Sequence, residues 1–249
     1  MYFLFDFMEY SEKKLIRDIR KQAGKTIFKY QMLDPDDHVL AGLSGGKDSL
    51  AMIDILAEKM RRIPVKFKTT AAYIELAGIP NKIDPLRLKE FCEERSVGFI
   101  HRMAEIDLTR DEAKDRCYVC ALHRRNSLFK LARELNCAKL ALGHNLDDMI
   151  STLLMNMSFH GNISTMPANV SLFGGELHII RPLAEIEEEA VAKYAEFLDL
   201  GVQISPCPFN EGENRHFIKK LINELAQKNP HAKTNIYRSM GRIKTDYLS

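Results

Sequence analysis

Apolar runs and amphipathic segments alternate along most of the chain. Residues 38–43 are mostly apolar and predict a short buried strand, whereas residues 47–62 carry Leu50, Ile53 and Leu56 at helical spacing. The same alternation predicts strands within 65–76, 98–103, 139–142 and 177–180, helices at 11–24, 85–95, 120–135, 147–157, 186–198 and 213–226, and a long irregular loop at 161–175. We therefore expect an α/β fold with a doubly wound, mostly parallel sheet, helical additions at both ends, and ligands at the carboxyl ends of its strands.

The composition is that of a soluble globular protein with a full core. The chain has 249 residues, of which 45% are hydrophobic and 28% are charged. No apolar run approaches the roughly 20 residues that span a bilayer, so we expect no membrane association. The apolar start carries Asp6 and Glu9 and lacks a basic region, so it does not indicate a signal peptide. The cytoplasm is the expected location.

The charge is unevenly distributed although the net charge is only +2. Residues 9–29 carry a net charge of +4, and residues 215–244 carry +7. Two basic ends around a nearly neutral middle indicate a polyanionic partner, and solvated helix faces are the alternative interpretation.

A candidate phosphate-binding loop follows the first predicted strand, at residues 44–49, Ser-Gly-Gly-Lys-Asp-Ser. Walker A spacing fails, because Ala41 stands where the first glycine is needed and Asp48 follows the lysine. The dinucleotide fingerprint fails at Ser44. The physical requirements are nevertheless met: glycines let backbone N–H groups approach closely, a helix begins at once, and Ser44 and Ser49 add hydroxyls. A strand–helix turn capped by Asp48 is the alternative.

This string resembles the PP-loop of the ATP-pyrophosphatases. Members of that superfamily cleave ATP between the α- and β-phosphates and adenylate a carbonyl oxygen, which a nitrogen or sulfur nucleophile then displaces together with AMP. The resemblance implies that Gly45, Gly46 and Ser49 cradle the pyrophosphate. It also implies that Lys47 stabilises the charge developing on it, and that Asp48 acts through Mg²⁺.

The cysteines suggest a second centre. Cys117 and Cys120 form a CxxC just before a predicted helix, and Cys207 lies far downstream. Three thiolates suit an iron–sulfur cluster with one open iron, or a zinc site completed by another ligand, and a redox dithiol is also possible in principle. Arginines at 116, 124 and 125 flank the pair and favour thiolates. For Cys92 and Cys137 we expect core packing.

Further strings around the CxxC point to one branch of the superfamily. They are Arg124-Arg125, Ala141-Leu142-Gly143-His144-Asn145-x-Asp147-Asp148, Met155-Asn156, Met166-Pro167, Arg181-Pro182-Leu183 and Pro206-Cys207. In this order, from about residue 37 to past 215, they resemble the tRNA-cytidine 2-sulfurtransferase family. That family makes 2-thiocytidine in the tRNA anticodon loop, with ATP, Mg²⁺ and a 4Fe-4S cluster held by three cysteines.

The resemblance assigns roles and boundaries to this chain. It implies that Cys117, Cys120 and Cys207 hold the 4Fe-4S cluster and take part in catalysis with Lys47 and Asp48. Nucleotide or Mg²⁺ contacts are expected from four further residues, Gly143, His144, Asp147 and Asp148. The implied organisation is an N-terminal helical segment (1–35), a PP-loop domain (36–205) and a basic helical tail with the third cysteine (206–249). The implied partners are tRNA and a sulfur donor, either a cysteine desulfurase or sulfide, and a homodimer is left open.

Some positions depart from the family pattern and leave room for different functions. Asn210 stands where some members have a further cysteine, and Asn145 where a second histidine is common. Related tRNA 2-thiouridine enzymes usually carry extra zinc-binding CxxC/H pairs, whereas this chain has one CxxC. Three rival functions use the same residues: a persulfide-using thiolase without a cluster, a 4Fe-4S desulfidase that needs no ATP, and a non-catalytic nucleotide-binding module with structural zinc.

Overall fold

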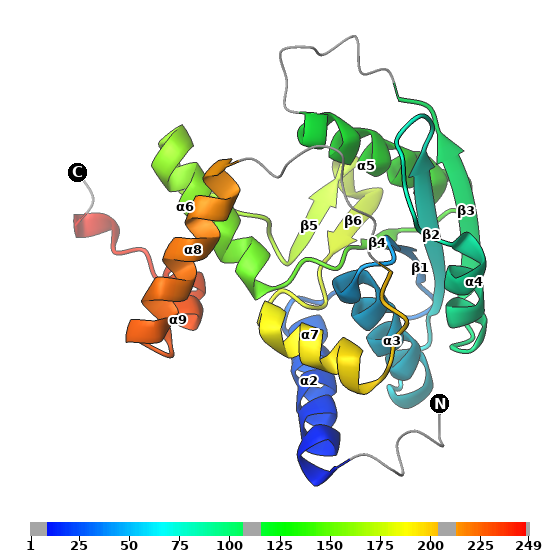
Figure 1. Cartoon of the computed structure of the whole chain (residues 1–249), viewed down its shortest axis with the longest axis horizontal. Helices are drawn as coiled ribbons and strands as arrows, with labels where there is room; N and C mark the ends of the chain where they lie inside the picture. Colours follow the sequence, from blue (N-terminus) through cyan, green and yellow to red (C-terminus); the bar gives the residue numbers. More distant parts are fainter. Residues whose placement is uncertain (1–8, 107–115, 204–212, 248–249) are drawn as a thin grey trace.

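A six-stranded sheet forms the centre of the molecule (Figure 1). The computed structural model describes residues 9–106, 116–203 and 213–247. The strand order is β3-β2-β1-β4-β6-β5, and all neighbours are parallel except β5 and β6. The strands are β1 (His38–Gly42), β2 (Lys68–Leu76), β3 (Gly98–Ala104), β4 (Lys139–Ala141), β5 (Asn169–Leu172) and β6 (Leu177–Ile180). The predicted doubly wound, mostly parallel sheet is confirmed.

Helices connect the strands and extend the chain at both ends. They are α2 (Tyr10–Lys29), α3 (Lys47–Arg62), α4 (Pro85–Glu93), α5 (Arg116–Glu134), α6 (Leu146–His160), α7 (Glu188–Phe197), α8 (Glu213–Lys228) and α9 (Ala232–Ser239), with 3₁₀ turns η1 (Phe173–Gly175) and η2 (Thr245–Tyr247). None of the described helices is long and apolar enough to cross a bilayer.

The sheet buries both of its faces. Val39 and Leu40 are adjacent in β1 and therefore point to opposite faces. Val39 belongs to a cluster formed with α2, α3, α4 and α7, whereas Leu40 packs with Leu128 and Leu131 of α5. Because α2 contributes Ile16 to the first cluster, this helix packs into the same core as the sheet. The domain boundaries at residues 35 and 205 stay a prediction.

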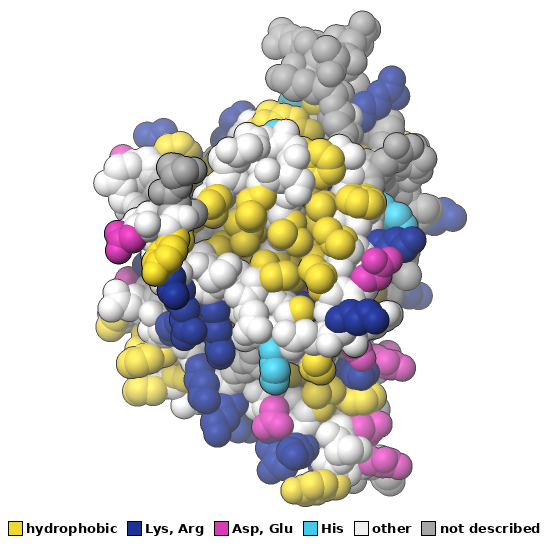
Figure 2. All heavy atoms as spheres, turned by 90° about the vertical axis from the view of Figure 1, so that its left-hand side faces the viewer, with side chains coloured by type: hydrophobic (Ala, Val, Ile, Leu, Met, Phe, Trp, Pro, Cys, Tyr) yellow, Lys and Arg dark blue, Asp and Glu magenta, His cyan; other side chains and the backbone are white. Residues whose placement is uncertain are grey.

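A third hydrophobic cluster joins α6 to α8 beside the sheet. It contains Leu146 and Ile150 from α6 and Ile218 and Ile222 from α8. Figure 1 shows α6, α8 and α9 together at one side of the molecule. Figure 2 faces that side and shows hydrophobic side chains gathered over it, bordered by a run of Lys and Arg.

A buried ion network ties the helices of the first face together. Asp54 of α3 is 1% exposed and accepts hydrogen bonds from Arg20 of α2 (2.9 Å), Arg95 (2.9 Å) and Tyr194 of α7 (2.6 Å). Burial opposes ionisation, but the hydrogen bond from Tyr194 and the charges of both arginines hold the pKa of Asp54 below its ordinary value. One carboxylate thus serves as the shared counterion of two arginines.

The structure differs from the sequence prediction at three elements. The predicted loop 161–175 contains β5, an edge strand whose partly exposed side chains carry no clear alternation. A further helix, α9, is only eight residues long, and Ile236 and Tyr237, which pack against the third cluster, are too few to show a helical period in the sequence. Helix α5 begins at Arg116, four residues before its predicted start, so Cys117 and Cys120 lie inside the helix and not just before it.

Candidate functional site

Two predicted nucleotide-binding segments meet at one point of the sheet. Residues 44–49 follow β1, and residues 142–145 follow β4. From β1 the chain moves through β2 and β3 to one side, whereas β4 and β6 lie on the other side, so the strand order reverses between β1 and β4. Ligands of open α/β sheets bind outside the carboxyl ends of strands at such a reversal.

The loop 44–49 is closed by its own serines. Ser49 Oγ accepts a hydrogen bond from Ser44 N (3.1 Å) and donates one to Gly46 O (2.9 Å), and Gly46 N donates to Ser44 Oγ (3.3 Å). Gly45 has a φ of +82°, in the region that favours glycine. Gly46 is the N-cap of α3 and has no side chain to satisfy the first N–H groups of the helix. These N–H groups and the helix dipole therefore suit a phosphate.

Lys47 is held between two carboxylates beside the loop. Its Nζ lies 2.9 Å from Asp48 Oδ2 and 2.8 Å from Glu188 Oε1 at the start of α7. Burial opposes the charged form, but the hydrogen bonds to Glu188 and Asp48 raise the pKa of Lys47 above its ordinary value. The side chain of Lys47 therefore stays protonated and positively charged beside the loop. Glu188 lies 141 positions from Lys47 in the sequence and belongs to none of the sequence motifs, so sequence reasoning missed it.

The segment after β4 packs directly on this loop. A Cβ at Gly143 would lie 3.0 Å from the carbonyl carbon and oxygen of Asp48, so only glycine fits there. Asn145 caps α6 and donates from Nδ2 to Asp48 Oδ1 (3.0 Å). In the sequence Asn145 is conspicuous only as a departure from the family pattern, and the structure shows it as the link between the two segments.

The two aspartates of this segment face different partners. Asp148 completes the capping box of α6 with Asn145, and its pKa is raised by burial and by the charges of Asp48 and Glu188. Asp147 accepts a hydrogen bond from Glu188 N (2.7 Å) and pairs with Lys233 of α9 (2.6 Å). Asp148 therefore lies among the carboxylates near Lys47, whereas Asp147 links α6 to α7 and α9.

A backbone bond connects the loop to a distant part of the chain. Gln203 N donates to the carbonyl of Gly45 (2.9 Å), and Gln203 Oε1 accepts from the backbone N of Asp84 before α4 (2.7 Å). Gln203, which lies four positions before Cys207 in the sequence, is therefore in contact with the loop 44–49. Cys207 itself lies outside the described residues.

Cys117 and Cys120 lie in the first turn of α5. Residues three apart on a helix share a face, so the two side chains can bind one centre. Since α5 follows β3 and precedes β4, this helix begins at the carboxyl edge of the sheet, the edge that carries residues 44–49. Cys117 is half-buried and Cys120 is nearly buried. In the described ranges no three His, Cys, Asp or Glu side chains form a metal-binding group.

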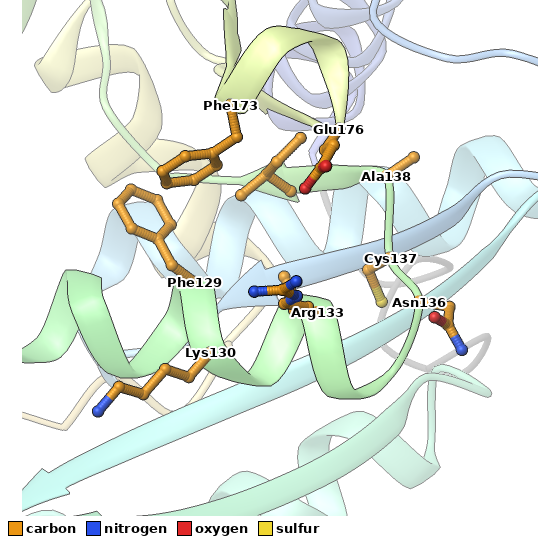
Figure 3. Close-up of a pocket in the computed structure, with 10 residues that line it drawn as sticks. Phe129, Lys130, Arg133, Asn136, Cys137, Ala138, Phe173 and Glu176 are labelled. Carbon is orange, nitrogen blue, oxygen red and sulfur yellow. The ribbon is translucent and has the colours of Figure 1, made fainter.

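The remaining two cysteines are core residues, as predicted. Burial raises the pKa of Cys92 to about 12 and that of Cys137 to about 11, so both are neutral thiols. Cys137 lines a cavity of about 600 Å³ between the end of α5 and the β5–β6 hairpin (Figure 3), where Phe129 and Phe173 meet edge to face. This cavity lies at the amino end of β4, so it does not belong to the site around residues 44–49.

His144 contacts an arginine instead of a carboxylate. Arg181 Nε donates to His144 Nδ1 (3.2 Å), and Arg181 Nη1 donates to the carbonyl of Pro167. The pKa of His144 is lowered to about 4 by burial and by the charges of Arg181, Arg125 and Arg215. The imidazole is therefore neutral, and positive charge from β6, α5 and α8 converges beside the loop.

Comparison with known proteins gives one family. A model of the PP-loop domain matches residues 14–225. The tRNA-cytidine(32) 2-sulfurtransferase of Syntrophotalea carbinolica is 32% identical over 247 residues, covering 95% of this chain and 93% of that protein. The protein of the same name from Shewanella woodyi is 35% identical over 239 residues, covering 92% and 72%.

A solved structure is also similar along nearly the whole chain. It is the U34-tRNA thiolase NcsA from Methanococcus maripaludis with its [4Fe-4S] cluster. The TM-score is 0.77 at 26% identity, and the match covers 98% of this chain and 83% of that one.

Proposed function

This chain belongs to the PP-loop family of tRNA-cytidine 2-sulfurtransferases, and from that premise we propose that it thiolates a cytidine of the tRNA anticodon loop at the expense of ATP. The observation that carries the proposal is the position of Cys117 and Cys120. They begin α5 at the sheet edge where residues 44–49 present the N–H groups of α3. A sulfur centre and a phosphate cradle at one edge suit an exchange of oxygen for sulfur.

The PP-loop residues carry the activation step. N–H groups at the start of α3 and the hydroxyls of Ser44 and Ser49 bind the β- and γ-phosphates, and Lys47 neutralises charge on the leaving pyrophosphate. The C2 oxygen of the base attacks the α-phosphorus, and the bond to the β-phosphate breaks. Sulfide then adds to C2, and the oxygen leaves with AMP, so the exchange needs no oxidant or reductant.

The carboxylates around Lys47 fit Mg²⁺. Asp48 and Asp148 carry the carboxylate oxygens that this ion prefers, and Mg²⁺ is usually held by one or two carboxylates together with substrate phosphates and water. Burial and the charges of Asp48 and Glu188 raise the pKa of Asp148, which is the crowding that a divalent cation relieves. We propose Asp48 as the Mg²⁺ residue, with Gly143, His144, Asp147 and Asp148 forming the neighbouring wall of the nucleotide site.

The cysteines fit a 4Fe-4S cluster. Cys117 and Cys120 share one face of the first turn of α5, and the chain enters the segment that carries Cys207 from Gln203, which is bonded to Gly45. When bound to these three cysteines, a cluster with one open iron supplies the sulfur for the exchange. Arg124 and Arg125 lie further along α5 and favour the thiolate ligands.

The proposed function also implies the conformation of the substrate, the partners of the protein and its location. The target base must leave its stack to bring its carbonyl to the ATP site. The basic C-terminal helices contact the tRNA, sulfur comes from a cysteine desulfurase or from sulfide, and the reaction takes place in the cytoplasm. Exposed apolar residues on α6 and α8, among them Met157, Phe159 and Phe217, support a homodimer.

The test is a thiolation assay. The full-length protein is reconstituted anaerobically with iron and sulfide and supplied with tRNA, ATP, Mg²⁺ and sulfide, and nucleosides are identified by mass spectrometry. We expect 2-thiocytidine, with AMP and pyrophosphate as co-products. Lys47→Met should lower the rate at least about 100-fold, and Cys117→Ser should abolish both bound iron and thiolation.

The matched control is Cys137→Ser, because Cys137 is a cysteine at the opposite edge of the sheet. This variant should retain the cluster and the activity. Thiolation by the Cys117→Ser protein at the wild-type rate would refute the cluster assignment, and absence of any thionucleoside from the wild type would refute the function.

A second candidate is thiolation of a uridine. The similarity to a U34-tRNA thiolase over 98% of this chain favours it. The same mass spectrometry decides, because 2-thiouridine and 2-thiocytidine differ in mass.

A further inference from the structure

Arg181 is a buried cation without a counterion among the described residues. It follows β6 and is 6% exposed. Within the described ranges its side chain donates to His144 Nδ1 and to the carbonyl of Pro167, and both acceptors are neutral. Burial, and the charge of Arg125, lower its pKa to about 10, so its surroundings disfavour the positive charge. A guanidinium removed from water in this way is stabilised by an anion.

Two further arginines extend the charge outward. Arg125 of α5 and Arg215 of α8 both lie close enough to His144 for their charges to lower its pKa, and both side chains are exposed. The result is a positively charged site at His144, formed by one buried and two exposed arginines. Because Gly143 contacts the backbone of Asp48, and His144 is the next residue, the site adjoins the PP-loop.

The geometry of arginine selects the anion. A planar guanidinium binds the oxygens of a phosphate group in a bidentate manner, and arginine is enriched at such sites. Both ATP and tRNA carry phosphates. The loop 44–49 already offers the helix N-terminus and two hydroxyls to the phosphates of ATP. The exposed positions of Arg125 and Arg215, and the basic helix α8, instead suit the backbone of a nucleic acid.

We propose that Arg181, Arg125 and Arg215 bind a backbone phosphodiester of the tRNA strand beside the target nucleotide. This inference rests on the proposed function. The contact fixes the strand between the PP-loop and the cysteines of α5, and it positions the base without touching the atoms that react.

The test measures binding of an anticodon stem-loop RNA to the full-length protein as a function of salt concentration. Arg125→Ala and Arg215→Ala should each weaken binding roughly tenfold and reduce the slope of log K against log salt by about one. Arg181→Lys should weaken binding in the same direction, since lysine keeps the charge and loses the planar fork. Affinity for ATP should stay at the wild-type value in all three.

Arg133→Ala is the matched control, because Arg133 is an exposed arginine of the same helix, two turns nearer to the amino edge of the sheet. It should bind the RNA as the wild type does. Unchanged RNA binding by the Arg125→Ala/Arg215→Ala double variant overturns the inference. Loss of ATP affinity with unchanged RNA affinity also overturns it and assigns the arginines to the nucleotide. If the wild type neither binds nor thiolates RNA, the proposed function fails instead.

Discussion

Two groups of arginines each have a buried member in this protein, and the surroundings of the two groups are opposite. Arg20 and Arg95 converge on Asp54, which carries a full negative charge between α2, α3 and α7. Arg181 converges with Arg125 and Arg215 on His144, which is neutral. Both arginines of the first group share the carboxylate of Asp54, whereas no carboxylate pairs with Arg181 among the described residues.

The direction of the pKa shifts separates the two roles. The pKa of Arg20 is raised, since the interactions with Tyr194 and Asp54 outweigh the opposing effect of burial. The pKa of Arg181 is lowered by burial and by another arginine. A buried arginine that the fold stabilises is part of the architecture, and one that the fold disfavours indicates a ligand.

The largest effect should come from removing the counterion of the first group. Asp54→Asn leaves two arginines facing a neutral amide, and we expect a loss of about 3–5 kcal/mol in the free energy of unfolding, measured in urea. Tyr194→Phe removes the two hydrogen bonds of the hydroxyl, to Asp54 and from Arg20, but keeps the carboxylate, and should cost less, about 1.5–3 kcal/mol. A stability of Asp54→Asn within about 1 kcal/mol of the wild type would contradict the structural role of this network.

A smaller effect is expected in the pH dependence of stability, because His144, beside the second group, titrates at a lower pH in the folded protein. His144 has a pKa of about 4 in the folded protein, and an ordinary histidine has 6.5, so only the unfolded chain gains a proton as the pH falls through this window. The free energy of unfolding should therefore decrease between pH 6.5 and 4, by at most about 1.4 kcal/mol per pH unit from this residue.

Glutamine at position 144 tests this expectation, because it can still accept from Arg181 and does not titrate. The stability of His144→Gln relative to the wild type should increase as the pH falls from 6.5 to 4, and should be constant above 7. Parallel pH profiles of the two proteins would show that neither burial nor the arginines lower the pKa of His144.

The smallest effect is expected at the second arginine group itself. Arg181→Met removes a cation that has no carboxylate partner in the described ranges, so the free energy of unfolding should change by less than about 1 kcal/mol in either direction. Urea denaturation measures it, with Asp54→Asn as the contrast. A loss as large as that of Asp54→Asn would place Arg181 among the structural arginines.

The sequence predicted the sheet and the PP-loop because both have local signals. The apolar run of β1 and the string at residues 44–49 each consist of consecutive residues, so each can be read directly from the sequence. Glu188 escaped prediction because its role depends on α7 beginning beside Lys47, a tertiary contact between residues 141 positions apart. Arg181 stands out in the sequence only as part of a family string, since nothing in a sequence shows that a cation will be buried without a carboxylate.

The bond between Gln203 and Gly45 has a consequence for how such a protein tolerates mutation. Both groups belong to the backbone, so replacing either side chain leaves the donor and the acceptor in place, and only a proline at position 203 removes the donor. The connection between the loop 44–49 and the backbone at Gln203 therefore does not depend on the side chain at either position.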